Sequence, residues 1–143
     1  MSDNQAKVPF ASPLWLDLVR ASLERLVAEH GEDGINYSVC ESFVEAPAEF
    51  SDDNGVAAWH FYVEGKRARV AIGRDDACEI QFQAAWRTAR KEARTVYTPE
   101  FLAERSKNPS APSDDLNHKL SGDISVIPDY LVELHNDMVV LTQ

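Results

Sequence analysis

Apolar residues recur at helical spacing near both ends of the chain and alternate with polar residues between them. Ser12-Pro13, a hydroxyl N-cap followed by proline, begins a predicted helix that ends at Gly31 and Gly34. Its apolar positions are Trp15, Leu18, Val19, Leu23, Leu26 and Val27. A last helix is expected over about 128–141, with Leu131, Leu134, Met138 and Leu141 on one side.

Alternation with a period of two predicts strands in the middle of the chain. Residues 35–44 form the first, with Ile35, Tyr37, Val39, Glu41 and Phe43 on one face. The clearest signal is a hairpin: Trp59, Phe61 and Val63 alternate with polar residues, Glu64-Gly65-Lys66 makes the turn, and 67–72 alternate again. We expect its Trp59/Phe61/Val63 face to point toward the helices. Residues 78–83 form a further strand.

The remaining segment, from residue 84, combines helices, a loop and a short strand. Helical spacing extends over 84–95, and Thr98-Pro99 begins a short helix that carries Phe101 and Leu102. A loop rich in proline and serine covers 108–115, and 116–123 is expected to form the last, short strand. This order predicts an α+β, two-layer fold: a mostly antiparallel five-stranded sheet covered on one face by helices.

Length and charge narrow the classes of function. The 143 residues fit one domain, which we assign to 12–143 after a flexible N-terminal tail at 1–11. The net charge of −10 opposes nucleic-acid phosphates and anionic lipid headgroups, so we expect no nucleic-acid partner and no stable membrane insertion. No secretory leader is evident, and Cys40 and Cys78 are expected to be buried free thiols. We therefore expect a cytoplasmic protein, either monomer or homodimer.

Motifs that would indicate catalysis are absent from the sequence. It contains no nucleophile elbow, zinc-protease motif or glycine-rich phosphate loop. The four histidines are scattered and read as surface or strand-face residues, and the Asp-Asp doublets fall at predicted turns. We accordingly predict no catalytic residue, no metal site and no cofactor.

Two features of the sequence allow more than one interpretation. The basic stripe Arg87, Arg90, Lys91 and Arg94 could hold an anionic headgroup, contact an acidic partner or form a solvated helix face. The large apolar residues could line a cavity or fill a solid core, because both have the same periodicity.

In the order and spacing of its elements, the chain resembles a sterol carrier protein-2-like domain over most of residues 14–141. The resemblance lies in a first helix followed by strands, Ala58-Trp59-His60-Phe61-Tyr62-Val63-Glu64-Gly65 at the hairpin, and Asp76 to Phe82 directly before a helix with Trp86. A short strand closing on Gly122-Asp123 and a final helix complete it. The chain departs from the family at 92–115, which is longer and contains prolines, and in lacking a peroxisomal address at Leu141-Thr142-Gln143.

The resemblance implies an apolar tunnel between sheet and helices that binds sterols, fatty-acyl chains or related lipids. It implies that the domain itself performs no catalysis and delivers its ligand to a partner enzyme. The apolar residues predicted to bind the ligand are Phe61, Trp86, Phe101, Leu102, Leu134 and Met138. Arg90 and Arg94 are predicted at the rim, where they would contact an anionic headgroup. Two alternatives stay open: a cone-shaped isomerase or dehydratase resembling ketosteroid isomerase, and an accessory protein with a solid core.

Overall fold

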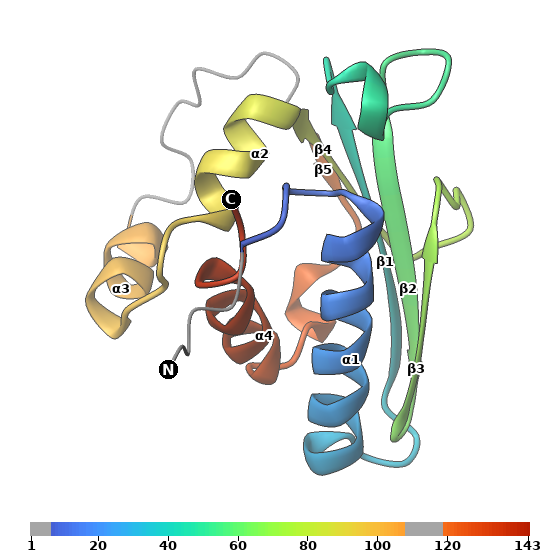
Figure 1. The fold of residues 1–143 in the computed structure, drawn as a ribbon. Helices are drawn as coiled ribbons and strands as arrows, with labels where there is room; N and C mark the ends of the chain where they lie inside the picture. Colours follow the sequence, from blue (N-terminus) through green and yellow to red (C-terminus); the bar gives the residue numbers. More distant parts are fainter. Residues whose placement is uncertain (1–6, 108–118) are drawn as a thin grey trace, which may run out of the picture.

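The computed structural model describes residues 7–107 and 119–143 of the chain. Figure 1 shows its elements in chain order. They are α1 (Pro13–His30), β1 (Asn36–Val44), the 3-10 turn η1 (Ala48–Phe50), β2 (Ala57–Glu64), β3 (Arg67–Ile72), β4 (Ile80–Ala85), α2 (Trp86–Ala93), α3 (Pro99–Lys107), β5 (Lys119–Ser121), the 3-10 turn η2 (Ile124–Val126) and α4 (Tyr130–Val139).

The five strands form one sheet in the order β3-β2-β1-β4-β5. The β1–β2, β2–β3 and β4–β5 pairs are antiparallel, whereas β1 and β4 run parallel. A parallel pair requires a crossover, and the chain makes it through residues 73–79, which lead from the edge strand β3 to β4. The predicted α+β class and the mostly antiparallel five-stranded sheet are confirmed.

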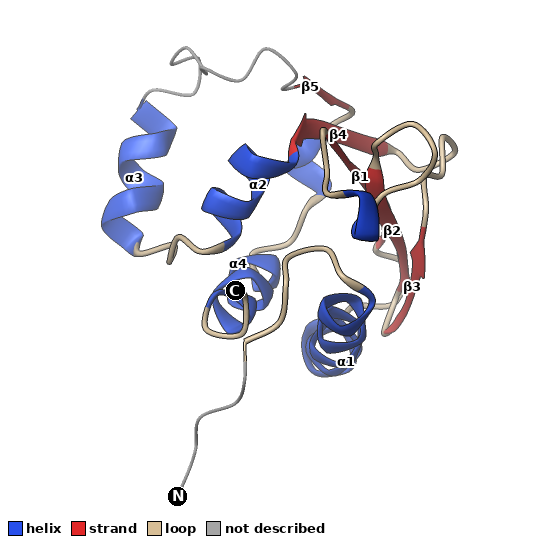
Figure 2. Ribbon diagram, turned by 45° about the horizontal axis from the view of Figure 1, so that its top comes forward, coloured by secondary structure: helices blue, strands red, loops and turns tan. Residues whose placement is uncertain are grey.

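The four α-helices of the described residues lie on one side of the sheet (Figures 1 and 2). The first begins as its sequence predicts: the Ser12 hydroxyl accepts a hydrogen bond from the Trp15 amide, and Pro13 occupies the first turn. α1 packs against β3 and α4, and α2 packs against β4, β1 and α4. α3 lies farthest from the sheet.

The segment before α1 is part of the core, which differs from the predicted tail. The Phe10 side chain is 3% exposed and lies with its ring centroid 4.9 Å from that of Phe43 and 5.0 Å from that of Trp15. Val8 forms a parallel bridge with Thr142 near the C-terminus. These contacts attach residues 8–11 to the domain, because the Phe10 ring packs on Phe43, which is remote in sequence, as well as on the nearby Trp15.

Several predicted boundaries shift in the structure. The strand expected over 78–83 begins at Ile80. The expected helix over 84–95 begins only at Trp86, because Ala84 and Ala85 continue β4 and pair with Phe43 and Val44. The last helix spans 130–139 rather than 128–141, and η2 precedes it. The strand expected over 116–123 is observed at 119–121 and ends before Gly122; residues 116–118 lie outside the described residues.

Gly122 follows β5 with a φ of +100°, a conformation that favours glycine. A β-carbon at this position would also run into the backbone carbonyl of Glu79. The structure therefore favours glycine at position 122, where the chain turns in close contact with the segment that leads into β4.

Within the described residues, no helix is both long and apolar enough to cross a membrane.

Candidate functional site

The helix-facing side of the sheet carries the large aromatic side chains. Trp59 and Phe61 stack with centroids 5.3 Å apart, and the Trp15 ring of α1 meets Trp59 edge-on at 5.7 Å. Phe61 also meets Tyr37 edge-on at 6.2 Å. Trp59, Phe61 and Val63 are all buried, which confirms that this face of the hairpin points toward the helices.

One row of residues across this face becomes more accessible toward β5. Register pairing places Glu41 of β1 between Trp59 of β2 and Phe82 of β4, and Phe82 is paired with Leu120 of β5. Trp59 is 5% exposed, Glu41 and Phe82 are partly exposed, and Leu120 is 47% exposed. Because register partners share a face, these four side chains form one row whose exposure decreases from the edge of the sheet to its interior.

Glu41 is the ionisable member of this row. Its neighbours on the same face of β1, Val39 and Phe43, are buried apolar residues. Burial raises the pKa of the Glu41 carboxyl to about 7, and the Trp59 indole beside it opposes this rise. With a pKa of about 7, a substantial fraction of the carboxyl is protonated and neutral near physiological pH.

The indole N–H of Trp59 lacks a conventional partner. It is buried, and no group within the described part of the chain completes a hydrogen bond with Nε1. Glu41 and Trp59 are register partners on adjacent strands, so the two side chains are neighbours without a well-aligned hydrogen bond between them. A buried donor without a partner is costly and rare in folded proteins.

The alternation in the sequence puts Glu41 on one strand face with Tyr37, Val39 and Phe43 but assigns it no role. The available signal was a charged residue within an otherwise apolar set of alternating positions, Tyr37, Val39 and Phe43. The unpartnered indole could not be found in this way, because hydrogen-bond geometry depends on the packed structure.

Four of the six apolar residues predicted to bind the ligand meet in the core. Phe61, Leu134 and Met138 are buried members of one hydrophobic cluster, and Trp86 is partly buried against it. The Trp86 indole N–H donates to the Phe10 carbonyl at 3.3 Å. Their role in ligand binding stays a prediction.

The other two, Phe101 and Leu102, lie on α3, away from this cluster. The Phe101 ring stacks on Tyr97 at 5.4 Å, and Tyr97 stacks on His135 of α4 at 3.6 Å. The structure thus places Phe101 in a separate aromatic stack between α3 and α4, and the side chains of Phe101 and Leu102 are partly exposed.

The two arginines predicted at the rim differ in their surroundings. Arg90 donates from Nε to the Gln143 carbonyl at 3.0 Å, and its guanidinium lies 5.9 Å from the centre of the Trp86 ring. Arg94 is exposed at the end of α2, as are Arg87 and Lys91 within the helix. Contact of Arg90 or Arg94 with a headgroup stays a prediction.

A polar network occupies the opposite face of the sheet. The Tyr62 hydroxyl donates to Asp75 at 2.6 Å, and His60 lies 3.8 Å from the same carboxylate while its Nδ1 contacts the Gly73 carbonyl at 2.8 Å. The hydrogen bond from Tyr62 holds the pKa of Asp75 below its usual range. The Ser38 hydroxyl accepts from the Glu79 amide at 2.8 Å. These contacts hold the 73–79 crossover against the sheet, so the His60–Asp75 pair has a structural explanation.

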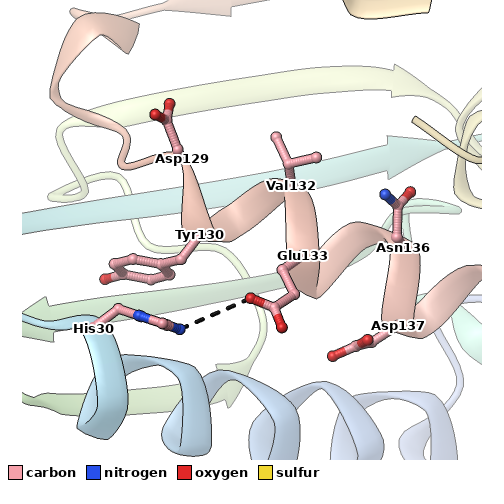
Figure 3. Close-up of a pocket in the computed structure, with 7 residues that line it drawn as sticks. All are labelled: His30, Asp129, Tyr130, Val132, Glu133, Asn136 and Asp137. Carbon is pink, nitrogen blue, oxygen red and sulfur yellow. Dashed lines mark ion pairs between the residues drawn. The ribbon is translucent and has the colours of Figure 1, made fainter. Parts of the chain in front are cut away.

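A surface groove of about 520 Å³ lies between the end of α1 and α4 (Figure 3). His30 lies 3.8 Å from Glu133, and its ring stacks on Tyr130 at 6.1 Å. Asp129, Val132, Asn136 and Asp137 complete the lining. The groove is open and most of its lining residues are polar or charged, and no cluster suited to a metal ion occurs among the described residues. It does not offer the apolar enclosure that a lipid-type ligand needs.

Comparison with known proteins finds similarity at the level of structure. No model of a known protein family matches the chain. No curated protein matches it either. Sterol carrier protein 2 superposes with a TM-score of 0.56 at 13% identity, over 90% of this chain and 98% of the other.

A second solved structure, from Thermus thermophilus, is a conserved hypothetical protein regarded as a candidate sterol carrier protein. It superposes with a TM-score of 0.53 at 13% identity, over 100% of this chain and 97% of the other. The sheet order, the helices on one face and these two superpositions together show that the chain has a sterol carrier protein 2-like fold.

Proposed function

We propose that this protein binds an apolar small molecule of the lipid, sterol or fatty-acyl type between its sheet and its helices. The observation that carries the proposal is the row from Trp59 through Glu41 and Phe82 to Leu120, which gains exposure toward the edge of the sheet. The likeness in fold to sterol carrier protein 2, whose name describes a carrier of sterols, supports the same class of ligand.

A binding role also agrees with the side chains around this row. Its surroundings are apolar, and the ionisable Glu41 stands without a histidine, cysteine or second carboxylate opposite it in register. General acid–base chemistry would need a substrate proton within reach of a positioned group, and the one close Asp–His pair among the described residues, His60 with Asp75, lies on the other face.

In this proposal the carrier works in a reducing compartment such as the cytoplasm and delivers its ligand to a partner enzyme, as a monomer or homodimer. The buried free thiols of Cys40 and Cys78 are consistent with a reducing compartment. The exposed basic side chains of α2, Arg87, Lys91 and Arg94, offer a surface for an acidic partner.

Native mass spectrometry of the protein purified from its own host tests the proposal directly. We expect a retained apolar molecule of defined mass. A thermal-shift series over sterols, fatty acids and acyl-CoAs provides the second measurement, since a ligand at 100 times its Kd adds about 2.7 kcal/mol to the free energy of unfolding. Protein that carries no ligand and shows no shift with any of these compounds would contradict the carrier function.

A further inference from the structure

We propose that Glu41 and Trp59 form the polar anchor of the ligand site, and that the preferred ligand is an apolar molecule with a hydroxyl group. This inference rests on the proposed carrier function and specifies its ligand chemistry. The two residues are direct register partners on adjacent strands, on the face of the sheet that the helices cover. Side chains in this relationship have β-carbons about 4.5–5.5 Å apart, close enough for one small polar group to contact both.

The first argument is the unused hydrogen-bonding capacity of the pair. Trp59 Nε1 is buried without a partner among the described residues, and the indole N–H can only donate. Within the same described residues, no ion pair or aligned hydrogen bond is formed by the Glu41 side chain. A neutral carboxyl both donates and accepts, so a hydroxyl could accept from the indole and exchange a second hydrogen bond with Glu41.

The second argument is access. Trp15 covers Trp59 from the side of α1, with ring centroids 5.7 Å apart. On the other side of Glu41, Phe82 is partly exposed and Leu120 at the edge is largely exposed. A ligand that enters from β5 would therefore lay its apolar body along Phe82 and reach the Glu41–Trp59 pair with one end.

The third argument separates an alcohol from an acid. The pKa of Glu41 is raised to about 7 by its apolar surroundings, so a second carboxylate brought beside it would add charge to a site that already disfavours charge. A hydroxyl brings no charge. The pair therefore discriminates against fatty-acid carboxylates while it accepts neutral alcohols.

The experiment compares ligands that differ only in the polar group: cholesterol with cholestane, and 1-hexadecanol with hexadecane and hexadecanoate. Each is delivered from cyclodextrin, and binding is measured by competition with a fluorescent apolar probe. We expect each alcohol to bind about tenfold more tightly than its hydrocarbon, the effect of one or two net hydrogen bonds. We also expect hexadecanol to bind more tightly than hexadecanoate.

Three variants test the residues. Glu41→Leu should remove the preference for each alcohol over its hydrocarbon. Glu41→Gln should retain most of that preference, because an amide still donates and accepts hydrogen bonds. Trp59→Phe keeps the stacked ring and should reduce the preference by several-fold. As a control, Glu64→Leu makes the same chemical change at an exposed position of β2 and should leave the preference intact.

The outcomes distinguish the inference from the function on which it rests. If the hydrocarbons bind but the alcohols bind no more tightly, or if the preference persists in both Glu41→Leu and Trp59→Phe, the anchor is wrong while the carrier function stands. If hexadecanoate binds most tightly, the assigned headgroup chemistry is wrong. If none of the five compounds binds, the carrier function and the anchor both fail.

Discussion

The Trp15 indole N–H donates a hydrogen bond to the Thr142 hydroxyl at 3.0 Å, across 127 positions of the chain. Both residues are buried, and the Thr142 hydroxyl in turn donates a hydrogen bond to the Met138 carbonyl at 2.6 Å. These two hydrogen bonds link the first helix, the last helix and the C-terminal segment. It joins the two ends of the chain beside the aromatic side chains of the core.

Replacing Trp15 by Phe should lower the free energy of unfolding by about 1–3 kcal/mol, through the lost hydrogen bond and the smaller ring. A double-mutant cycle with Thr142→Val isolates the hydrogen bond, for which we expect a coupling of about 1 kcal/mol in urea denaturation. Additive effects of the two substitutions would show that this contact contributes little.

Phe61→Ala should lower the free energy of unfolding by about 3–5 kcal/mol, because Phe61 is 4% exposed and packs against both Trp59 and Tyr37. Ile72→Ala is the matched control at the edge of the sheet. The Ile72 side chain is 64% exposed, so its truncation should cost about 0.5 kcal/mol or less. Equal losses in the two variants would contradict the burial of the hairpin face.

Glu41→Gln should change how stability depends on pH. The pKa of Glu41 rises from 4.5 to about 7 on folding, so the folded state holds a proton that the unfolded state releases between these values. Burial of the carboxyl costs nothing below pH 4.5; this cost grows from there to about pH 7 and levels at about 3 kcal/mol above.

The neutral amide of Glu41→Gln lacks this titration. We therefore expect the variant to gain stability over the wild type as pH rises from 4.5 to about 7, and to keep a constant advantage at higher pH. Urea denaturation across the range from acid to mildly alkaline pH measures the effect, and Glu64→Gln at an exposed position serves as control. Parallel curves for Glu41→Gln and the wild type would mean that Glu41 is well solvated.

Met138→Trp tests whether ligand space reaches α4. The Met138 side chain is 4% exposed in the core cluster with Leu134. If ligand space adjoins it, a larger ring should occupy that space and block ligand uptake with little loss of stability. A solid core would instead be overpacked, at a cost of about 1–3 kcal/mol or more, and this result would exclude Met138 from the site.

Leu14→Trp is the control for this substitution, because it introduces the same ring on the exposed side of α1, where Leu14 is 62% exposed. It should leave both ligand uptake and stability near the wild-type values. The ligand measurement is competition with the fluorescent apolar probe.

Local sequence patterns determined most of the elements of this protein. The Ser12-Pro13 cap placed the start of α1, and alternation placed the hairpin and the direction of its Trp59/Phe61 face. These features depend on residues near one another in the chain, through helical and strand periodicity and turn geometry. For the same reason the α+β class and the helices on one face followed from the order of the elements.

Contacts between remote segments decided the rest. Phe10 belongs to the core because its ring packs on Phe43 and Trp15. Ala84 and Ala85 extend β4 because they pair with β1. Phe101 lies outside the core, where its ring stacks on Tyr97. Glu41 became a candidate anchor only when strand register set it beside an unpartnered Trp59 indole. Periodicity reports which face a side chain occupies, whereas burial, hydrogen-bond partners and the pKa of a carboxyl depend on atoms that the fold brings from elsewhere in the chain.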